Sequence, residues 1–462
     1  MYKLTSHALC ACIYFASLTG CTGANQQSSK DPQVPPIANQ QDSRKQLIAD
    51  LKFKDPALKK CVDSMVSQHN WKTVGEFVTL DCYGLTKNRL SLDAAIKDLA
   101  GLEQLIALKK LSIPGHGYSS IDVSALKELE ELNLYEAFVR TLDLSRNTHL
   151  RSLNVGATAI DDLNLMGLRN LKVLIAAYDG EGFHDSYTPY AYNVHGPNYG
   201  ISLQEVQNQQ KTIRLDPAVQ LTNIDLGNNG LIDLPNATAL VSARGQINVS
   251  SLQGAQNTLE TLDINIDGIA RLDLSQYKKL YGIKVVSTQV RSISIPLTAK
   301  TLSFSGPIDD LIIPGDALLT DLTLEGAGAL TPLDLKVPKN LERIDVNNIA
   351  LKTVDFAHLT NLSFLMLTKV GLERLNLPSA PLAFYIIEPR APEGQISNLS
   401  AVKYFELYKS NSMYCHLDWA SFAALESLGI SGCPGDAISS AGLTNLTSAR
   451  RIMPNLIEFS VY

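Results

Sequence analysis

A leucine pattern recurs through most of the chain at a nearly constant spacing, and it limits the possible fold more than any other feature. Segments of the form Leu-x-x-Leu-x-Leu, with Val or Ala in place of the last Leu in some, begin at Leu129, Leu150 and Leu171, which are 21 residues apart. Segments of the same kind begin at Leu108, Leu221, Leu259, Leu280, Ala299, Leu319, Leu341, Leu362, Leu382, Val402, Leu425 and Leu456. The last two apolar residues alternate with other residues, which is the period of a β-strand. Because one unit cannot bury its leucines alone, we expect the units to stack as coils whose strands form a parallel sheet.

A stack of amphipathic helices is the alternative, since 21 residues is also a multiple of the helical heptad. Pro, Gly and Asn are scattered through the units, as in "LSIPGH" and "LDLSRN", and they disfavour helices. The repeats resemble the leucine-rich repeats of bacterial surface proteins of the internalin type, over about three quarters of the chain. This resemblance implies a leucine-rich-repeat solenoid, a curved parallel β-sheet horseshoe with few helices and a small α/β N-terminal cap. The Asn expected after the strand is often missing, so the ladder of Asn side chains should be incomplete.

The first residues have the features of an export signal. Lys3 precedes a mostly apolar run at residues 8–18, which is too short for the roughly 20 residues of a spanning helix. The sequence Leu18-Thr19-Gly20-Cys21 resembles the lipobox of bacterial lipoproteins, which implies a lipid on Cys21. A plain secretory signal is the alternative. Thr at position 22 resembles the signal for outer-membrane sorting, if the source is Gram-negative.

The predicted organisation has four parts. Residues 1–20 are a lipoprotein signal peptide and residues 21–45 a flexible tether rich in Gln, Asn, Ser and Pro. Residues 46–107 are an N-terminal cap whose helix starts with Asp55 as N-cap and Pro56 in the first turn. Residues 108–462 are the leucine-rich-repeat domain, with an insertion at about 178–220.

The four cysteines that follow Cys21 fall into two pairs. Cys61 and Cys82 lie in the predicted cap, which resembles the caps of exported leucine-rich proteins. An exported protein meets an oxidising compartment, so we expect a Cys61–Cys82 disulfide. Cys415 and Cys433 lie in neighbouring late coils and form a second candidate bridge.

Sequence motifs of catalysis are not found. The chain has no P-loop, zinc-protease, nucleophile-elbow or dinucleotide-binding motif. We therefore expect a protein that is not an enzyme and that needs no cofactor or metal. A net charge of −6 without a basic block argues against a nucleic-acid partner.

Candidate ligand-binding residues lie in the late coils, where large apolar groups are predicted on the outward face of the strands. They are Phe364, Met366, Phe384, Ile386, Tyr404, Glu406 and Tyr408. Such a patch is typical of an interaction surface. A loop or the C-terminal segment folding over these residues is the alternative. The middle coils are predicted to present an acidic run through Asp263, Asp321 and Asp345.

A second candidate region is the long interval between Leu171 and Leu221, which is 50 residues instead of 21. Its Tyr, Gly, Asn and His content resembles that of an antibody paratope. The candidate residues are Tyr178, Phe183, Tyr187, Tyr190, Tyr192 and Tyr199. The alternatives are a structural plug of the solenoid and, more remotely, a metal site of His184, Asp185 and His195.

The sequence therefore predicts a lipid-anchored protein of the cell envelope, located at the outer membrane. Its leucine-rich-repeat face would recognise a protein or glycan ligand, and it would meet the membrane only through its lipid. A scaffold or assembly factor of the outer membrane is the alternative function. An enzyme with a site in the Tyr/His insertion is a remote third.

Overall fold

The computed structural model describes ten stretches of the chain. They are residues 37–83, 95–177, 212–227, 229, 232–326, 333, 335–389, 395–408, 417–432 and 443–451. Met1–Asp42 and Ser43–Tyr462 form two compact units. The predicted signal peptide and Cys21 lie outside the described residues, while the last residues of the predicted tether belong to helix α1 (Ile37–Lys45). In the described ranges, no helix has the length and apolar character needed to cross a membrane.

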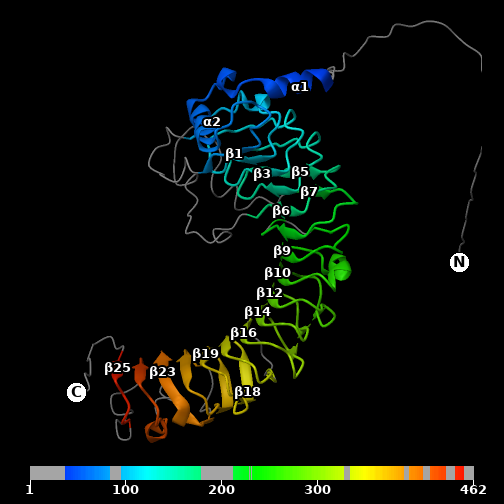
Figure 1. Cartoon of the computed structure of the whole chain (residues 1–462). Helices are drawn as coiled ribbons and strands as arrows, with labels where there is room; N and C mark the ends of the chain where they lie inside the picture. The colour runs from blue at the N-terminus through cyan, green and yellow to red at the C-terminus, as the bar shows by residue number, and fades with distance from the viewer. Residues whose placement is uncertain are drawn as a thin grey trace, which may run out of the picture. The chain divides into compact units, whose positions relative to one another are not determined.

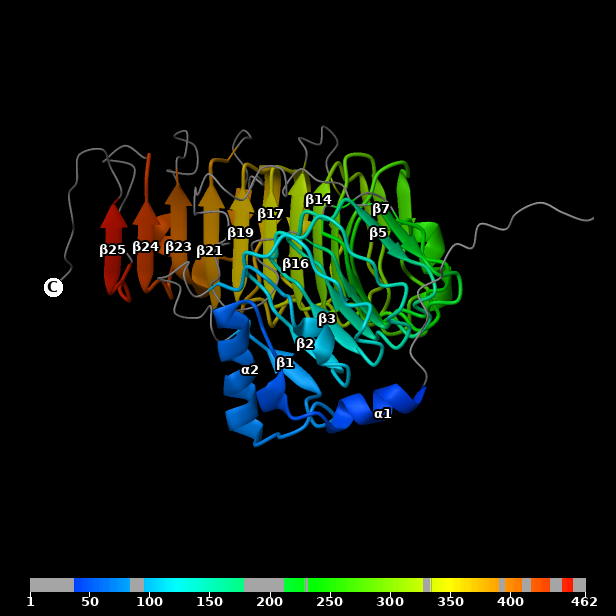
Figure 2. The same cartoon turned by 90° about the horizontal axis from the view of Figure 1, so that it is seen from above.

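One large parallel sheet organises the unit Ser43–Tyr462. In the described part of the chain it has seventeen strands, each paired only with its neighbours. The strands are β1 (Thr79–Asp81), β2 (Lys110–Ser112), β3 (Glu131–Asn133), β4 (Ser152–Asn154), β6 (Val173–Ile175), β8 (Asn223–Asp225), β9 (Ser242–Gly245), β10 (Thr261–Asn265), β12 (Gly282–Val286), β14 (Thr301–Gly306), β16 (Asp321–Gly326), β17 (Arg343–Asn347), β19 (Phe364–Thr368), β21 (Leu382–Ile387), β23 (Val402–Tyr408), β24 (Ser427–Ile430) and β25 (Ser448–Arg451). They follow one another along the inner side of the curve in Figure 1, and Figure 2 shows their arrows pointing the same way.

The remaining strands form three further parallel sheets on the other side of the coils. The first sheet contains β5 (Asp162–Leu165) and β7 (Thr212–Leu215). The second contains β11 (Arg271–Asp273), β13 (Ser292–Ser294) and β15 (Asp310–Ile312). The third contains β18 (Ala350–Asp355), β20 (Gly371–Asn376) and β22 (Gln395–Ser397). Short 3-10 turns lie at Ile48–Asp50, Leu102–Gln104, Val249–Ala255, Leu399–Ala401 and Trp419–Ser421. The predicted leucine-rich-repeat solenoid with few helices is thus confirmed.

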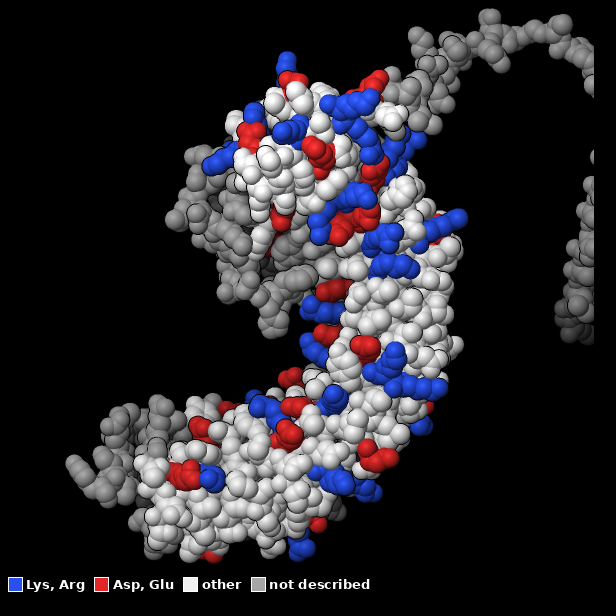
Figure 3. Space-filling model, in the orientation of Figure 1, with Lys and Arg blue, Asp and Glu red and all other residues white. Residues whose placement is uncertain are grey.

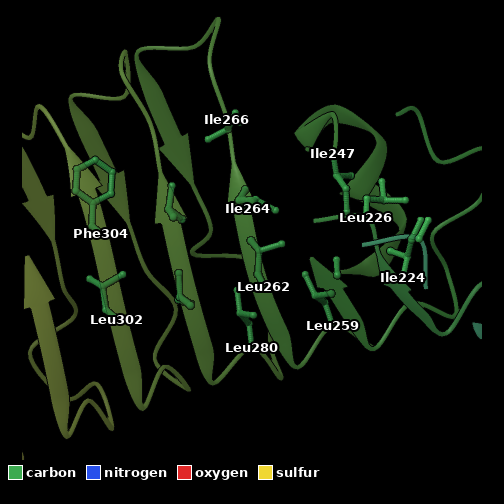
Figure 4. Close-up of a cluster of buried hydrophobic side chains, with 14 of the residues drawn as sticks. Ile224, Leu226, Ile247, Leu259, Leu262, Ile264, Ile266, Leu280, Leu302 and Phe304 are labelled. Carbon is green, nitrogen blue, oxygen red and sulfur yellow. The ribbon is translucent and has the colours of Figure 1, made fainter. Parts of the chain in front are cut away.

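The core fills the space between these sheets. Leu262, Ile283 and Leu302 lie in register on consecutive strands and are almost fully buried. Figure 4 shows how such side chains project from successive coils into one continuous core. Because each strand alternates buried and outward residues, the apolar ladder on one side leaves a matching ladder of outward side chains on the other.

The segment before β2 joins the sheet directly. Helix α2 (Pro56–His69) begins after Asp55, whose Oδ1 accepts hydrogen bonds from the backbone N–H groups of Ala57 (2.7 Å) and Leu58 (3.3 Å). A Cys61–Cys82 disulfide of 2.11 Å links α2 to the residue that follows β1. This predicted bridge is confirmed. Cys415 and Cys433 lie outside the described residues.

The leucine pattern missed two coils, those of β9 and β25. Strand β9 pairs with β8 and β10, and its coil begins with Leu240 but has Ala243 and Gly245 where most other coils have larger apolar residues. Gly245 has a φ of 117°, and a Cβ there would lie 2.7 Å from the Cβ of Leu226. The small inward residues of this coil therefore fit the close approach of its neighbour.

The long interval after Leu171 contains most of one ordinary coil. Strand β7 pairs with β5 in continuous register, from Asp162 with Thr212 to Leu165 with Leu215. The coil therefore resumes at Thr212, earlier than the predicted end of the insertion at about residue 220. Residues 178–211 lie outside the described part of the chain.

Candidate binding surface

The outward side chains of the large sheet form the candidate surface, which we call the sheet face. They lie in rows, because the strands pair in parallel register. One row, for example, contains Asp263, Lys284, Ser303, Thr323, Asp345, Met366, Tyr385 and Glu406 on eight consecutive strands. Neighbouring strands are about 4.8 Å apart, so these side chains are close enough to act together.

The middle of the sheet face carries a ladder of alternating charges. Arg244 lies 3.4 Å from both Asp225 and Asp263, and Lys284 lies 3.4 Å from Asp263. Red and blue atoms alternate accordingly along the inner side of the curve in Figure 3. The acidic run predicted for these coils is confirmed only in part. Arg244, in the missed coil of β9, and Lys284 balance Asp263, whereas Asp321 and Asp345 form no ion pair within 4.0 Å among the described residues. Partly exposed pairs such as these contribute little to stability.

A shallow hollow lies beside this charge ladder. It has a volume of about 450 Å³ and is lined by side chains of Ser242, Arg244, Thr261, Asp263, Lys284, Thr301, Ser303, Asp321 and Thr323, with Gly282 among them. Gly282 and the short side chains of Thr301, Ser303 and Thr323 form part of its lining on β12, β14 and β16. A Cβ on Gly282 would meet Thr261 Cγ2 at 3.4 Å, which is an ordinary contact.

Large apolar side chains gather further along the sheet face, on β19, β21 and β23. We call them the apolar patch: Phe364, Met366, Tyr385, Ile387, Tyr404 and Tyr408. The rings of Phe364 and Tyr385 are 5.3 Å apart, and Tyr404 is 47% exposed. The structure thus places the predicted residues Phe364, Met366, Tyr404, Glu406 and Tyr408 on one face.

Two predicted members of this surface point into the core instead. Phe384 and Ile386 are 0% and 4% exposed, and the ring of Phe384 packs 5.5 Å from that of Phe405. The prediction was wrong because the register shifts between Leu382 and Ala383. A shift of one residue exchanges the two faces of a strand. Tyr385 and Ile387, which the sequence analysis missed, therefore face outward.

The missed residues gave only a weak signal. In "LAFYII" both alternating sets of positions after Leu382 contain large apolar residues, so hydrophobicity does not choose between the two phases. The one available hint is polarity, because the Tyr385 hydroxyl prefers a place where it can reach water.

Charged groups border the apolar patch. The guanidinium of Arg343 lies over the ring of Phe364, 3.7 Å from its centroid. Burial raises the pKa of the neighbouring Asp345, with Arg343 opposing and Glu325 adding to the shift. Tyr404 donates a hydrogen bond to Glu426 (3.4 Å), which is also paired with Lys403 (2.8 Å). The patch and its border therefore combine aromatic rings, two cations and partly buried carboxylates.

The candidate residues of the insertion, Tyr178, Phe183, Tyr187, Tyr190, Tyr192 and Tyr199, lie outside the described residues. So do His184, Asp185 and His195. Before the insertion, Val173 and Ile175 of β6 are partly exposed on the sheet face. Within the described ranges, His, Cys, Asp and Glu residues form no group of three or more that could hold a metal ion.

Comparisons with known proteins give solved structures only. No protein-family model matches the chain. No curated protein matches it either. The chain is similar to the functional domain of the internalin InlJ from Listeria monocytogenes, with 17% identity, 82% of this chain and 74% of that chain covered, and a TM-score of 0.46. It is also similar to a leucine-rich-repeat protein of Leptospira interrogans, with 14% identity, 76% and 86% covered, and a TM-score of 0.45. It is similar as well to the internalin InlF from Listeria monocytogenes, with 13% identity, 86% of this chain and 95% of that chain covered, and a TM-score of 0.41.

Proposed function

We propose that this protein recognises another protein through its sheet face, with the apolar patch at the centre of the contact. One observation carries the proposal: three neighbouring strands, β19, β21 and β23, present six large apolar side chains in register on a mostly polar face. Aromatic residues surrounded by polar groups are typical of the residues that dominate binding energy at protein interfaces.

The solenoid favours such a role because it holds the patch rigidly. Each of the three strands is hydrogen-bonded on both sides, and their inward residues Leu365, Phe384 and Phe405 are buried. Little conformational entropy remains to be lost on binding, so more of the contact energy appears as affinity.

The test compares partner capture by three forms of the purified full-length protein. The first is wild type, the second carries Tyr385→Ser and Tyr404→Ser, and the third is a matched control with Leu297→Ser and Ile312→Ser. The control residues are 50% and 42% exposed and lie outside the large sheet. Proteins captured from envelope extracts are quantified by mass spectrometry, and folding is checked by circular dichroism.

We expect wild type and control to retain at least one protein that the Tyr double variant loses. Retention of the same proteins by all three folded forms would exclude the apolar patch as the binding site.

We also propose that the chain is lipidated on Cys21 and anchored at the outer membrane of a Gram-negative envelope. This proposal rests on the sequence Leu18-Thr19-Gly20-Cys21 and on Thr22. Globomycin should cause the precursor to accumulate, and Cys21→Ser should abolish palmitate labelling. Processing that is insensitive to globomycin would contradict lipidation, and fractionation with the inner membrane would contradict the location.

A further inference from the structure

The charges around the apolar patch are unbalanced. From β16 to β24, the charged residues described on the outward side of the strands are Asp321, Glu325, Arg343, Asp345, Lys403 and Glu406. Arg343 packs on the ring of Phe364, and Lys403 is paired with Glu426 at 2.8 Å, so neither cation is paired with Asp345 or Glu406. The charge ladder from β8 to β12 differs, because each of its carboxylates has a cation at 3.4 Å.

Two of these carboxylates flank two large apolar residues within one row of the sheet face. Asp345, Met366, Tyr385 and Glu406 follow one another on β17, β19, β21 and β23. Asp345 and Glu406 are separated by three strand spacings, which is about 14 Å at 4.8 Å per strand. Neither Asp345 nor Glu406 forms an ion pair within 4.0 Å with a described residue. Burial raises the pKa of Asp345, as expected for a carboxylate without full compensation.

The rings between these carboxylates are suited to cations. Arg343 already stacks on Phe364 at 3.7 Å, so the fold itself places a guanidinium against one ring of the patch. Tyr404, exposed by 47%, offers a further ring next to Glu406 on the same strand. A cation over an aromatic face gains roughly 0.5–2 kcal/mol, and pairing with a carboxylate strengthens the contact.

We propose that the apolar patch takes a cationic segment of its protein partner, with Arg or Lys side chains lying against Tyr385 and Tyr404 and pairing with Glu406 and Asp345. This inference rests on the proposed function and names the chemistry of the partner. A purely apolar partner would bury both carboxylates without compensation, and an acidic one would add repulsion.

The experiment uses three fluorescein-labelled dodecapeptides that share their Leu and Gly positions. Four remaining positions carry Arg in the first peptide, Gln in the second and Glu in the third. Binding to the purified full-length protein is measured by fluorescence anisotropy at low and high salt. We expect the Arg peptide to bind at least about tenfold more tightly than the Gln peptide, with the Glu peptide weakest. The preference should shrink at high salt, because salt screens exposed charges.

Variants assign this preference to particular groups. Glu406→Gln should remove most of the Arg-over-Gln preference and leave the Kd of the Gln peptide nearly unchanged. Tyr404→Ser should weaken both peptides. The matched control is Glu373→Gln, an exposed carboxylate on β20 in a different sheet, which should leave the preference intact.

The possible outcomes separate the two proposals. Equal affinity for the Arg and Gln peptides, or a preference that survives Glu406→Gln, overturns the cationic partner. If Tyr404→Ser still weakens binding in that case, the apolar patch remains a binding site. Absence of binding by every peptide also overturns the cationic partner, while the capture experiment decides separately on the proposed function.

Discussion

At the scale of single residues, Asp345 shows a conflict between folding and binding. It lies between Thr323 and Met366 on the sheet face, partly buried, and burial raises its pKa. An Asn at this position would fit the same space without a charge to desolvate. A carboxylate that the fold disfavours is what we expect where a ligand supplies the missing compensation.

We expect Asp345→Asn to affect stability and binding in opposite directions. The pKa of Asp345 is raised above its usual 3.8, so the ionised group destabilises the fold at neutral pH, and this cost disappears as pH falls below 3.8. The Asn variant should therefore melt slightly higher than wild type at pH 7 and equally at pH 3.5. Its affinity for the Arg peptide should fall. A variant that melts lower at pH 7 would contradict the assignment.

His116 gives a pH prediction of the opposite sign. Burial lowers its pKa to about 4, against opposing contributions from the Cys82 backbone and Asp55. The imidazole ring is neutral in the folded protein, whereas in the unfolded chain it takes up a proton near pH 6.5. Stability should therefore fall as pH drops from 6.5 to 4, by up to about 1.4 kcal/mol per pH unit. Urea unfolding at pH 7, 5.5 and 4.5 measures this slope, and a His116→Gln variant should show a shallower one. Equal slopes would refute the role of His116.

At the scale of elements, the sequence predicted most strands of the large sheet, missed β9 and β25, and exchanged the two faces of β21. The strand alternation was clear wherever every second residue was Leu or Ile and the residues between them were polar, as in β10 and β16. In β9 the inward residues Ala243 and Gly245 are small, because neighbouring coils approach closely there. The search for large apolar residues at these positions therefore missed this strand. In β21 both phases are apolar, so the apolar patch could be predicted only in part.

The two glycines of β9 and β12 should respond differently to the same change. Gly245 has a φ of 117°, and a Cβ would meet Leu226 at 2.7 Å and the Gly227 carbonyl at 2.9 Å. Gly282 has ordinary contacts of 3.4 Å or more. We expect Gly245→Ala to destabilise by about 1–3 kcal/mol, while Gly282→Ala stays within about 0.5 kcal/mol. Thermal melting of the two variants side by side tests this contrast, and equal losses would disprove it.

The Cys61–Cys82 bridge should stabilise the N-terminal segment. It closes a loop with a sequence separation of 21 residues, for which restriction of the unfolded chain is worth about 3 kcal/mol. We expect the Cys61→Ala, Cys82→Ala double variant to lose about that much. Hydrogen exchange should show the loss in α2 and β1 first. Unchanged protection of α2 in the variant would show that packing alone holds this segment.

At the scale of the whole molecule, the unit Ser43–Tyr462 is a one-dimensional stack. Each strand of the large sheet pairs only with the strands of adjacent coils. Stability is then a sum of coil energies and contacts between neighbours. This property was predictable from the 21-residue spacing, because no coil of that length can bury its own apolar residues. The position of the apolar patch within the stack was not predictable from this spacing, because it depends on side chains outside the repeat pattern.

The last prediction follows from this arrangement. Phe405 is 1% exposed, and its ring packs 5.5 Å from Phe384 and 5.2 Å from Phe422. Phe405→Ala should create a cavity and cost about 3–5 kcal/mol. Because coupling in a stack runs between neighbours, hydrogen exchange should accelerate in β19 to β24 and stay unchanged in β2 to β4.

The matched variant Leu132→Ala, in the core of β3, should show the reverse distribution. Loss of protection through all coils in either variant would mean that the solenoid unfolds as a single cooperative unit. If the loss is local, Phe405→Ala should also abolish peptide binding, because Tyr404 and Glu406 lie on the same strand. Leu132→Ala should leave that binding unchanged.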